Sequence, residues 1–390
     1  MSISTKRPRI AFLTSGDPRD RRSWSGIDFY MARALQEHVG DVAYLGDLTP
    51  GIRLSLGKVL NKLSETILNR RYAYLHSMLL AKGYAQAVDT RLRENDIDVI
   101  FVPSDSTVAA LIETKLPMVY LSGATFALMN SYYPQYSNLL AKSVKEGNKL
   151  EQLTISKAGL LLYASEWAAQ SSMKDYGADR SRIHVLPYGA NLEKEDLPTR
   201  EEVYRKRRSD RCRLLFMGVD WERKGGRIAF DTLVELENRG VPAELIVCGC
   251  TPPARFAHKR MRTIPFLSKS DASDRRRLAE LYLESDFLLL PTRGECFGVV
   301  FCEASAFGLP IITTNTGGVG GAVTEGENGF MLSPEAGGWE YAELIQRLLE
   351  SEGIYSAVVK SSRAAFEDRL NWDAWGRRVA GLLDGITGSR

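Results

Sequence analysis

The sequence predicts an α/β protein built from two domains, each a parallel sheet covered by helices on both faces. Three observations lead to this fold class. The length of 390 residues suits two or three domains of ordinary size. Short apolar runs alternate with stretches of helical periodicity along the whole chain, a pattern typical of βα units. A strongly charged segment, residues 190–212, separates two series of such units, and we place the linker there.

The predicted strands are short apolar runs bounded by turn signals. In the first half they are residues 10–14, 42–45, 98–102, 118–121, 159–164 and 183–186. In the second half they are residues 213–217, 243–248, 287–291 and 310–314. We therefore expect one domain over residues 1–192 and another over 193–370. Residues 371–390 carry apolar side chains at helical spacing, and they either complete the second core or return to brace the first domain.

Composition narrows the possible functions. Hydrophobic residues make up 44% of the chain and charged residues 25%, as in ordinary globular proteins. The net charge of +3 is too small to predict a nucleic-acid partner. Five scattered cysteines and four separated histidines predict neither a disulfide framework nor a metal site. The sequence shows no secretion signal and no apolar stretch of membrane-spanning length, so we expect a cytoplasmic protein.

A polar, glycine-rich segment follows the strand predicted at 287–291. It reads PTRGECFGVVFCEASAFGLPIITTNTGGVGG. Ligands of parallel sheets bind at the carboxyl ends of the strands, where this segment begins. Residues 298–307 have the pattern of a helix, and its first backbone amides have no partner inside the helix. Those amides and the helix dipole favour a phosphate at Gly298.

Glu295 and Glu303 lie on either side of this predicted helix start. If the residues between them are helical, they rise by about 12 Å, more than the roughly 5–9.5 Å between the carboxylates of a glycosidase. The two acids therefore suit opposite ends of one elongated ligand. Two solvated glutamates beside a core helix are the structural alternative.

The segment GVDWERKGG comes directly after the strand predicted at 213–217. Arg223 and Lys224 stand at the start of the next predicted helix, where they can bind an anionic leaving group through charge-assisted hydrogen bonds. A basic surface turn without a ligand is the alternative interpretation.

The segments ECFGVVFCE and GLPIITTNTGG resemble the E-x7-E region of retaining glycosyltransferases of family 4. The resemblance implies the GT-B architecture, two Rossmann-like domains facing each other across a cleft. It implies transfer of a hexosyl unit from a UDP- or GDP-sugar to a hydroxyl of a glycan or glycolipid, without a metal or other cofactor. A phosphorylase, an inverting transferase or a two-domain sugar-binding protein are the alternatives.

The resemblance also implies a role for each matching residue. Glu295 would face the donor sugar, Arg223 and Lys224 the leaving diphosphate, and Glu303 the ribose. The expected catalytic residues are Glu295, Arg223 and Lys224. The other expected donor-binding residues are Glu303, Phe297, Gly298, Val299, Gly26, Gly317 and Gly318.

The first half matches the family more loosely. Gly26 precedes a predicted helix, and in the family this glycine loop closes over the diphosphate; a plain helix cap at Ser25 is the alternative. Val219 stands where many members carry an arginine, and Gly123 stands where members often present a histidine or aspartate. These departures leave the diphosphate to Arg223 and Lys224 and put side-chain assistance near Gly123 in doubt.

Residues 51–82 form a basic segment with apolar residues on one helical face. The apolar residues are Ile52, Leu56, Val59, Leu60, Leu63 and Ile67. The basic residues are Arg53, Lys58, Lys62, Arg70, Arg71 and Lys82, against the single acid Glu65. Two interpretations follow: a helix that covers the domain with a solvated outer face, or a helix on the anionic inner face of a membrane.

Overall fold

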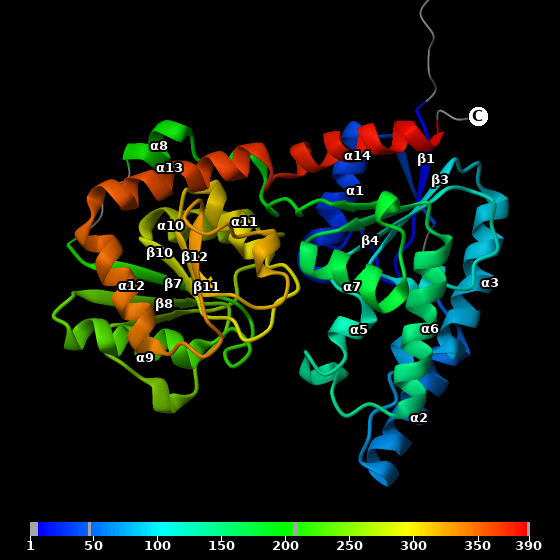
Figure 1. The fold of residues 1–390 in the computed structure, drawn as a ribbon, viewed down its shortest axis with the longest axis horizontal. Coiled ribbons are helices and arrows are strands. Elements are labelled where there is room, and N and C mark those ends of the chain that lie inside the picture. Colours follow the sequence, from blue (N-terminus) through cyan, green and yellow to red (C-terminus); the bar gives the residue numbers. More distant parts are fainter. Residues whose placement is uncertain (1–6, 46–47, 206–209, 388–390) are drawn as a thin grey trace, which may run out of the picture. The chain divides into compact units, whose positions relative to one another are not determined.

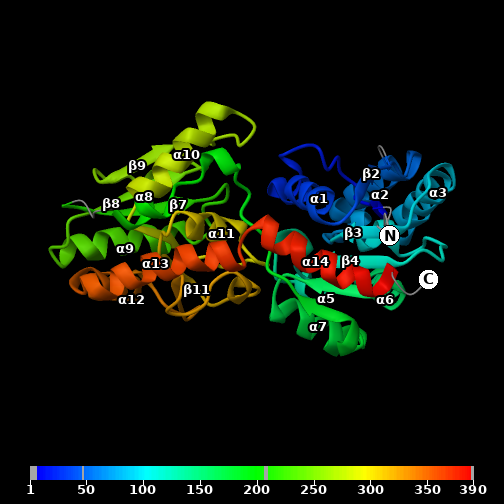
Figure 2. The same cartoon turned by 90° about the horizontal axis from the view of Figure 1, so that it is seen from above.

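The computed structural model describes residues 7–45, 48–205 and 210–387. The chain divides into two compact units, which are described separately (Figures 1 and 2). The first contains residues up to Pro187 and from Trp375 onward, and the second contains Tyr188–Ala374.

The first unit is built on a parallel sheet with the strand order β2-β1-β3-β4-β5-β6. Its strands are β1 (Arg9–Phe12), β2 (Asp41–Tyr44), β3 (Val99–Pro103), β4 (Met118–Ser122), β5 (Leu160–Tyr163) and β6 (Ile183–Val185). Its helices are α1 (Ile27–His38), α2 (Ile52–Leu68), α3 (Met78–Glu94), α4 (Ser106–Ala109), α5 (Phe126–Met129), α6 (Ala141–Lys157) and α7 (Glu166–Tyr176). The last helix, α14 (Trp372–Thr387), belongs to this unit from Trp375 onward.

Alternating side chains of these strands fill two apolar layers, because successive residues of a strand point to opposite faces. On one face, Ile100 and Val102 pack in a core that includes Leu80 of α3. On the other, Phe101 meets the Trp375 ring of α14 edge-on, at a centroid distance of 6.1 Å. Burial on both faces explains why the strands read as continuous apolar runs.

The second unit repeats the design with the strand order β12-β11-β10-β7-β8-β9, again all parallel. Its strands are β7 (Cys212–Met217), β8 (Ala243–Cys248), β9 (Met261–Ile264), β10 (Phe287–Leu290), β11 (Ile311–Thr314) and β12 (Gly329–Leu332). Its helices are α8 (Arg200–Arg205), α9 (Gly226–Asn238), α10 (Ala272–Glu284), α11 (Val299–Ala306), α12 (Gly338–Glu350) and α13 (Glu352–Asp368).

The predicted α/β fold with two parallel sheets is confirmed, and every predicted strand is present within two residues of its predicted ends. The strand β12 was not among the predicted strands, and neither was β9. Its sequence, MRTI, is half polar and exposed, because β9 lies at the edge of its sheet. An edge strand has only one neighbour, so it needs no continuous apolar run.

The unit boundary differs from the boundary expected at residue 192. Tyr188 already belongs to the second unit, where its carbonyl oxygen accepts a hydrogen bond from the Cys302 thiol. Ala190 likewise donates its N–H to the carbonyl of Leu370, at 2.9 Å. The expected linker at 190–212 is therefore folded within the second unit where the structure describes it; the stretch 206–209 lies outside the described residues. Within this segment, Val203 of α8 is fully buried.

Candidate functional site

The direction of the strand order reverses at the centre of the second sheet. From β7 the chain continues to β8 and β9 on one side, whereas from β10 it continues to β11 and β12 on the other. The loops after β7 and β10 therefore leave in opposite directions. Such a switch point is where open parallel sheets bind ligands. Both segments singled out in the sequence, GVDWERKGG and PTRGECFG, are these two loops.

Glycine allows the two loops to touch. Gly225 has a φ of 77°, which favours glycine, and a Cβ atom placed there would lie 1.9 Å from the carbonyl oxygen of Pro291. The backbone of Arg293 donates to the carbonyl of Arg223 at 2.7 Å, which fastens the loops together. The residues between these contacts are thereby held at one end of the sheet.

Lys224 and Glu295 form an ion pair between these two loops. Both side chains are about nine-tenths buried, with exposed fractions of 11% and 12%. Charges withdrawn from water in this way are costly unless they are paired. The pair therefore holds the Glu295 carboxylate beside the loop that follows β7.

Arg223 adds a second positive charge near the Glu295 carboxylate. Its Nη1 atom donates to the carbonyl of Gly294 at 2.9 Å and lies 3.7 Å from the Glu295 carboxylate. Its Nε atom lies 3.5 Å from Asp220, an acid that the sequence analysis did not single out. The structure thus brings together all three residues expected to be catalytic: Glu295, Arg223 and Lys224.

The helix α11 begins next to this cluster. Gly298 is its N-cap, with a φ of 88°, and Val299 is its first residue. A Cβ atom on Gly298 would lie 2.4 Å from the Phe301 ring, so only glycine fits this turn. Phe297 is buried and packs on Tyr188 at a centroid distance of 4.9 Å. Its side chain therefore serves the core, and only its backbone remains a candidate for donor contacts.

Glu303 is buried and already has two partners within the protein. It lies on α11 with 3% exposure, pairs with Lys269, and accepts a hydrogen bond from the Tyr282 hydroxyl at 3.0 Å. Tyr282 is itself fully buried, and burial followed by the charge of Glu303 raises the pKa of its hydroxyl well above the ordinary value. The hydroxyl therefore stays protonated and donates to the carboxylate.

Neither Lys269 nor Tyr282 was predicted from the sequence to contact Glu303. Lys269 lies in the loop before α10, 34 residues before Glu303, and Tyr282 lies on α10 itself. No spacing rule links a lysine in one loop to a glutamate on a later helix. The apolar spacing around Tyr282 marks only a buried helix face, so its hydroxyl gave no signal of a polar partner.

One premise about the two acids was wrong. The separation of about 12 Å assumed a helix through all eight intervening residues. The helix begins only at Val299, since residues 295–298 form a turn that ends in the left-handed Gly298. The acids are therefore placed by their different partners rather than by helical rise.

The loop after β11 also reaches this cluster. Gly318 donates its N–H to the carbonyl of Glu295 at 2.9 Å, and Gly317 adopts a φ of 53°. Asn328 is fully buried, and its side-chain amide donates to the Ser305 hydroxyl and the Ala322 carbonyl, so its role is structural. Each expected residue of the second unit thus lies in one of the three loops or on α11.

The first unit has its own switch point, between β1 and β3. The turn before α1 contains three consecutive left-handed residues, Trp24, Ser25 and Gly26, with φ values of 43°, 57° and 85°. Non-glycine residues in this region cost about 1–3 kcal/mol each, and such strain gathers at ligand sites. Gly26 directly precedes α1, as predicted, and it is Gly26 rather than Ser25 that is the N-cap of this helix.

A buried carboxyl group lies in the first turn of α1. Asp28 is 3% exposed and accepts a hydrogen bond from Ser23 at 3.2 Å, whereas its Oδ1 atom has no hydrogen-bond partner among the described residues. Burial, with a smaller contribution from Asp105, raises the pKa of Asp28 to about 7. The sequence gave no hint of it, because an acid in the first turn of a helix is ordinary.

No side chain replaces the missing histidine or aspartate at Gly123. This glycine is buried in the turn after β4, between Ser122, whose hydroxyl donates to Ala124, and Thr125, which caps α5. The ring of Trp167 packs against the ring of Tyr132 in a tilted arrangement, at a centroid distance of 5.4 Å.

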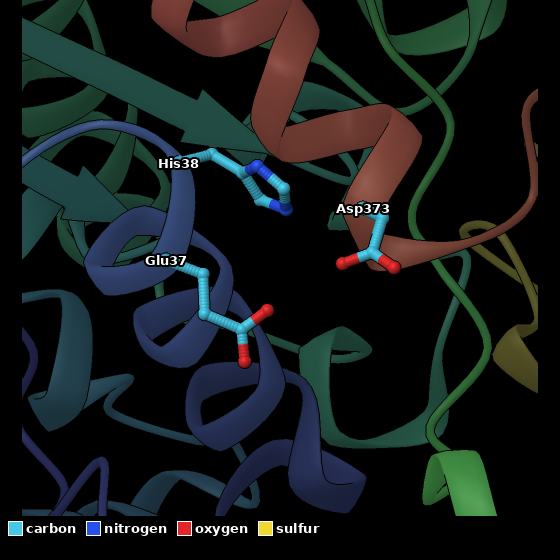
Figure 3. Close-up of side chains that lie close together, drawn as sticks. All are labelled: Glu37, His38 and Asp373. Atoms are coloured by element: carbon cyan, nitrogen blue, oxygen red, sulfur yellow. The ribbon is translucent and has the colours of Figure 1, made fainter.

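The acids and histidines offer no metal site within either unit, as far as the described residues go. Figure 3 draws Glu37 and His38 on the last turn of α1, and Asp373 on the first turn of α14. The first two belong to one unit and Asp373 to the other, so we assign the three no joint role. Asp98 accepts the backbone N–H of Arg9 at 2.8 Å, so this acid has a structural partner.

A hollow of about 1100 Å³ lies at the opposite end of the strands of the second sheet. Its walls include Cys212, the first residue of β7, and Asp286, which precedes β10. These are amino ends of strands, whereas ligands of parallel sheets bind at the carboxyl ends. We therefore keep the candidate site at the switch point.

Comparisons of the sequence find similarity to glycosyltransferases. Residues 211–351 match the family model described as glycosyl transferases group 1. The D-inositol 3-phosphate glycosyltransferase of Xylanimonas cellulosilytica is 28% identical over 253 residues, which are 60% of this chain and 58% of that protein. The chain therefore spans less than two thirds of that relative's length.

Two solved structures resemble the whole chain. Sucrose-phosphate synthase from Thermosynechococcus elongatus has a TM-score of 0.69 at 16% identity, covering 99% of this chain and 100% of that one. Anabaena HepE in complex with UDP and glucose has a TM-score of 0.62 at 15% identity, covering 97% and 99%. The fold is therefore of the GT-B type, and residues 211–351, which match the glycosyl transferases group 1 model, lie within the second unit.

Proposed function

We propose that this protein is a glycosyltransferase that moves a hexosyl unit from a nucleotide diphosphate sugar to a hydroxyl of a glycan or glycolipid, with retention of anomeric configuration. The observation that carries the proposal is the gathering of Arg223, Lys224 and Glu295 at the switch point of the second sheet. Two cations, a carboxylate and a helix N-terminus match the parts of such a donor. The resemblance to a UDP-bound and glucose-bound structure supports the same donor class.

The proposed roles follow from charge. Arg223, Lys224 and the first amides of α11 stabilise the negative charge that develops on the departing diphosphate. Glu295 hydrogen-bonds hydroxyls of the sugar, and Glu303 those of the ribose. The anomeric carbon–oxygen bond to the diphosphate breaks while a new bond forms to the acceptor oxygen, and the acceptor proton passes to the leaving diphosphate. No protein base is needed for this step.

The donor must compete with pairs already present inside the protein. Lys224 is paired with Glu295, so a bound diphosphate would share Lys224 with that carboxylate. Lys269 is paired with Glu303 in the same way. We infer that these pairs hold both acids in place before the donor arrives. Because Arg223 and Lys224 supply the positive charge, we also propose that transfer needs no metal ion.

Binding of nucleotides tests the donor class directly. UDP, GDP, ADP and TDP and their hexose conjugates would be titrated by calorimetry and by thermal shift. Glu303→Ala should lose binding of nucleotide and conjugate alike, whereas Glu295→Ala should keep nucleotide binding and weaken only the conjugate. Glu343→Gln on α12 is a matched control for removal of an acid, and it should change neither. A protein indifferent to every nucleotide would contradict the proposal.

Product analysis separates the remaining alternatives. Proton NMR of the product gives its anomeric configuration, and an inverted configuration would identify an inverting transferase. A phosphorylase would instead cleave a glycosidic bond with inorganic phosphate and need no nucleotide. Full activity in the presence of a chelator would support metal independence, and activity restored only by a divalent cation would contradict it.

A further inference from the structure

The helix α2 of the first unit lies on the protein with its apolar stripe turned outward. Ile52 is 85% exposed and Ile67 is 73% exposed, values that are unusual for large aliphatic side chains. The stripe continues along the whole helix. Its exposed members are Ile52, Leu56, Val59, Leu60, Leu63, Ile67 and Leu68.

The inner face of α2 explains this orientation. Gly57 and Ser64 are the buried residues of the helix. A Cβ atom on Gly57 would lie 2.9 Å from Cβ of Tyr74, so the helix sits close to the chain beneath it. Asn61 accepts the backbone N–H of Tyr72, and Ser64 donates to the carbonyl of Arg70. Small and polar residues, together with Leu54, thus face inward, and the other apolar residues of the helix are left outside.

Exposed positive charge lies beside the apolar stripe. Lys58 and Lys62 follow one another by one helical turn and are exposed, and Arg70 is exposed just beyond the helix end. The acid of the helix, Glu65, lies 3.7 Å from Arg71. Figure 1 shows α2 at the end of the first unit, beyond the strands. An apolar stripe flanked by cations matches a lipid surface whose headgroups are anionic.

We propose that α2 is a docking surface for an anionic membrane. The apolar stripe enters the boundary between headgroups and acyl chains, and Lys58, Lys62 and Arg70 pair with lipid phosphates. Among the described residues no helix is long and apolar enough to cross a bilayer. The contact is therefore a peripheral one. It rests on the surface of α2 alone and does not depend on which reaction the protein catalyses.

Co-sedimentation with vesicles tests the proposal. The probes are vesicles of phosphatidylcholine alone and of equal parts phosphatidylcholine and phosphatidylglycerol. The wild-type chain should bind the anionic vesicles, more weakly at high salt. The triple variant Leu56→Ser, Leu63→Ser, Ile67→Ser should lose this binding at least tenfold. Its circular dichroism and nucleotide binding should be unchanged, because these side chains point away from the core.

Matched controls separate the stripe from general stickiness and from net charge. Ile67→Ser should weaken vesicle binding, whereas Ile354→Ser, at an exposed isoleucine of α13, should not. Neutralising Lys58 and Lys62 to glutamine should weaken binding about fivefold for each lysine. The control with the same loss of charge is Lys259→Gln with Lys360→Gln, both exposed on the second unit, and it should bind as the wild type.

Three results would overturn the proposal. The first is no binding to anionic vesicles even at low salt. The second is binding that the triple variant retains. The third is a dimer in solution that the triple variant converts to a monomer, since a second copy of the chain would then cover the stripe. Nucleotide binding is measured on the same samples, so a failure of the membrane proposal is distinguishable from a failure of the proposed transferase function.

Discussion

Lys224 and Glu295 are 71 residues apart in the sequence, yet they form one ion pair at the centre of the second sheet. Their loops follow β7 and β10, which are hydrogen-bonded neighbours. Because the pair is nearly buried, each charge depends on the other. Because of this mutual dependence, replacing either residue should change the free energy of unfolding as well as activity.

Removing one member of the pair should destabilise the second unit. Lys224→Met leaves Glu295 nearly buried with Arg223 as its remaining cation, and we expect a loss of about 1–3 kcal/mol in the free energy of unfolding. The double variant Lys224→Met with Glu295→Leu should regain most of that loss. Urea unfolding of all members of this double-mutant cycle gives the coupling energy. A coupling near zero would contradict the importance of the pair.

The contact between the two loops should require glycine at position 225. Gly225→Ala would place its Cβ 1.9 Å from the Pro291 carbonyl oxygen, so the loops must move apart. We expect a destabilisation of more than about 2 kcal/mol and weaker nucleotide binding. Gly240→Ala is the matched control, because Gly240 has a φ of 75° but no atom within 4 Å of the added Cβ. It should cost only about 1 kcal/mol and leave nucleotide affinity unchanged.

A cation added beside Arg223 should strengthen binding of the diphosphate. Val219 is 66% exposed in the loop after β7, so an arginine fits there without repacking. Val219→Arg should tighten UDP or GDP binding severalfold at low salt, and the gain should shrink as salt is added. Val219→Gln has a similar length without the charge, and it should bind as the wild type does. Equal affinities for all three proteins would mean that the diphosphate does not approach this loop.

The stability of the first unit should fall as the pH rises from the ordinary carboxyl pKa to about 7. Burial raises the pKa of Asp28 to about 7, and also that of Glu151, which accepts a hydrogen bond from Tyr120. Between the ordinary carboxyl pKa and about 7, the folded state binds more protons than the unfolded state. These two acids therefore lower the free energy of unfolding as the pH rises across this window, and their contribution levels off above it. His76 offsets part of this loss below about pH 6.5, because burial lowers its pKa to about 4.

Replacing one buried acid tests this pH dependence. Asp28→Asn should flatten the pH profile and raise stability at about pH 8 by up to a few kcal/mol. Glu94→Gln, at an exposed acid of α3, should leave the profile as it is in the wild type. Native-state hydrogen exchange of the β3 and β4 amides reports on the first unit alone. A profile of Asp28→Asn that is as steep as the wild type would show that Asp28 does not titrate in this range.

Much of the fold could be predicted from the local pattern of apolar residues and turns. Both series of βα units were predicted because burial on both faces makes each central strand a continuous apolar run, such as residues 287–291. The candidate donor residues were predicted because Glu295, Arg223 and Lys224 occupy loops that directly follow such strands. Residue 188 was not recognised as the start of the second unit, since the contacts of Tyr188 are made with residues far along the chain.

The sequence by itself determined the α/β class, the positions of the strands, and the loops in which the candidate residues lie, because these depend on local apolar pattern and turn chemistry. Only the tertiary structure decided the strand order that creates the switch point, and the partnership of Glu303 with Lys269 and Tyr282. It also decided that α2 turns its apolar stripe outward. Helical periodicity reveals that a helix has two faces, but which face is buried depends on the surface beneath it, here one that accepts Gly57, Asn61 and Ser64.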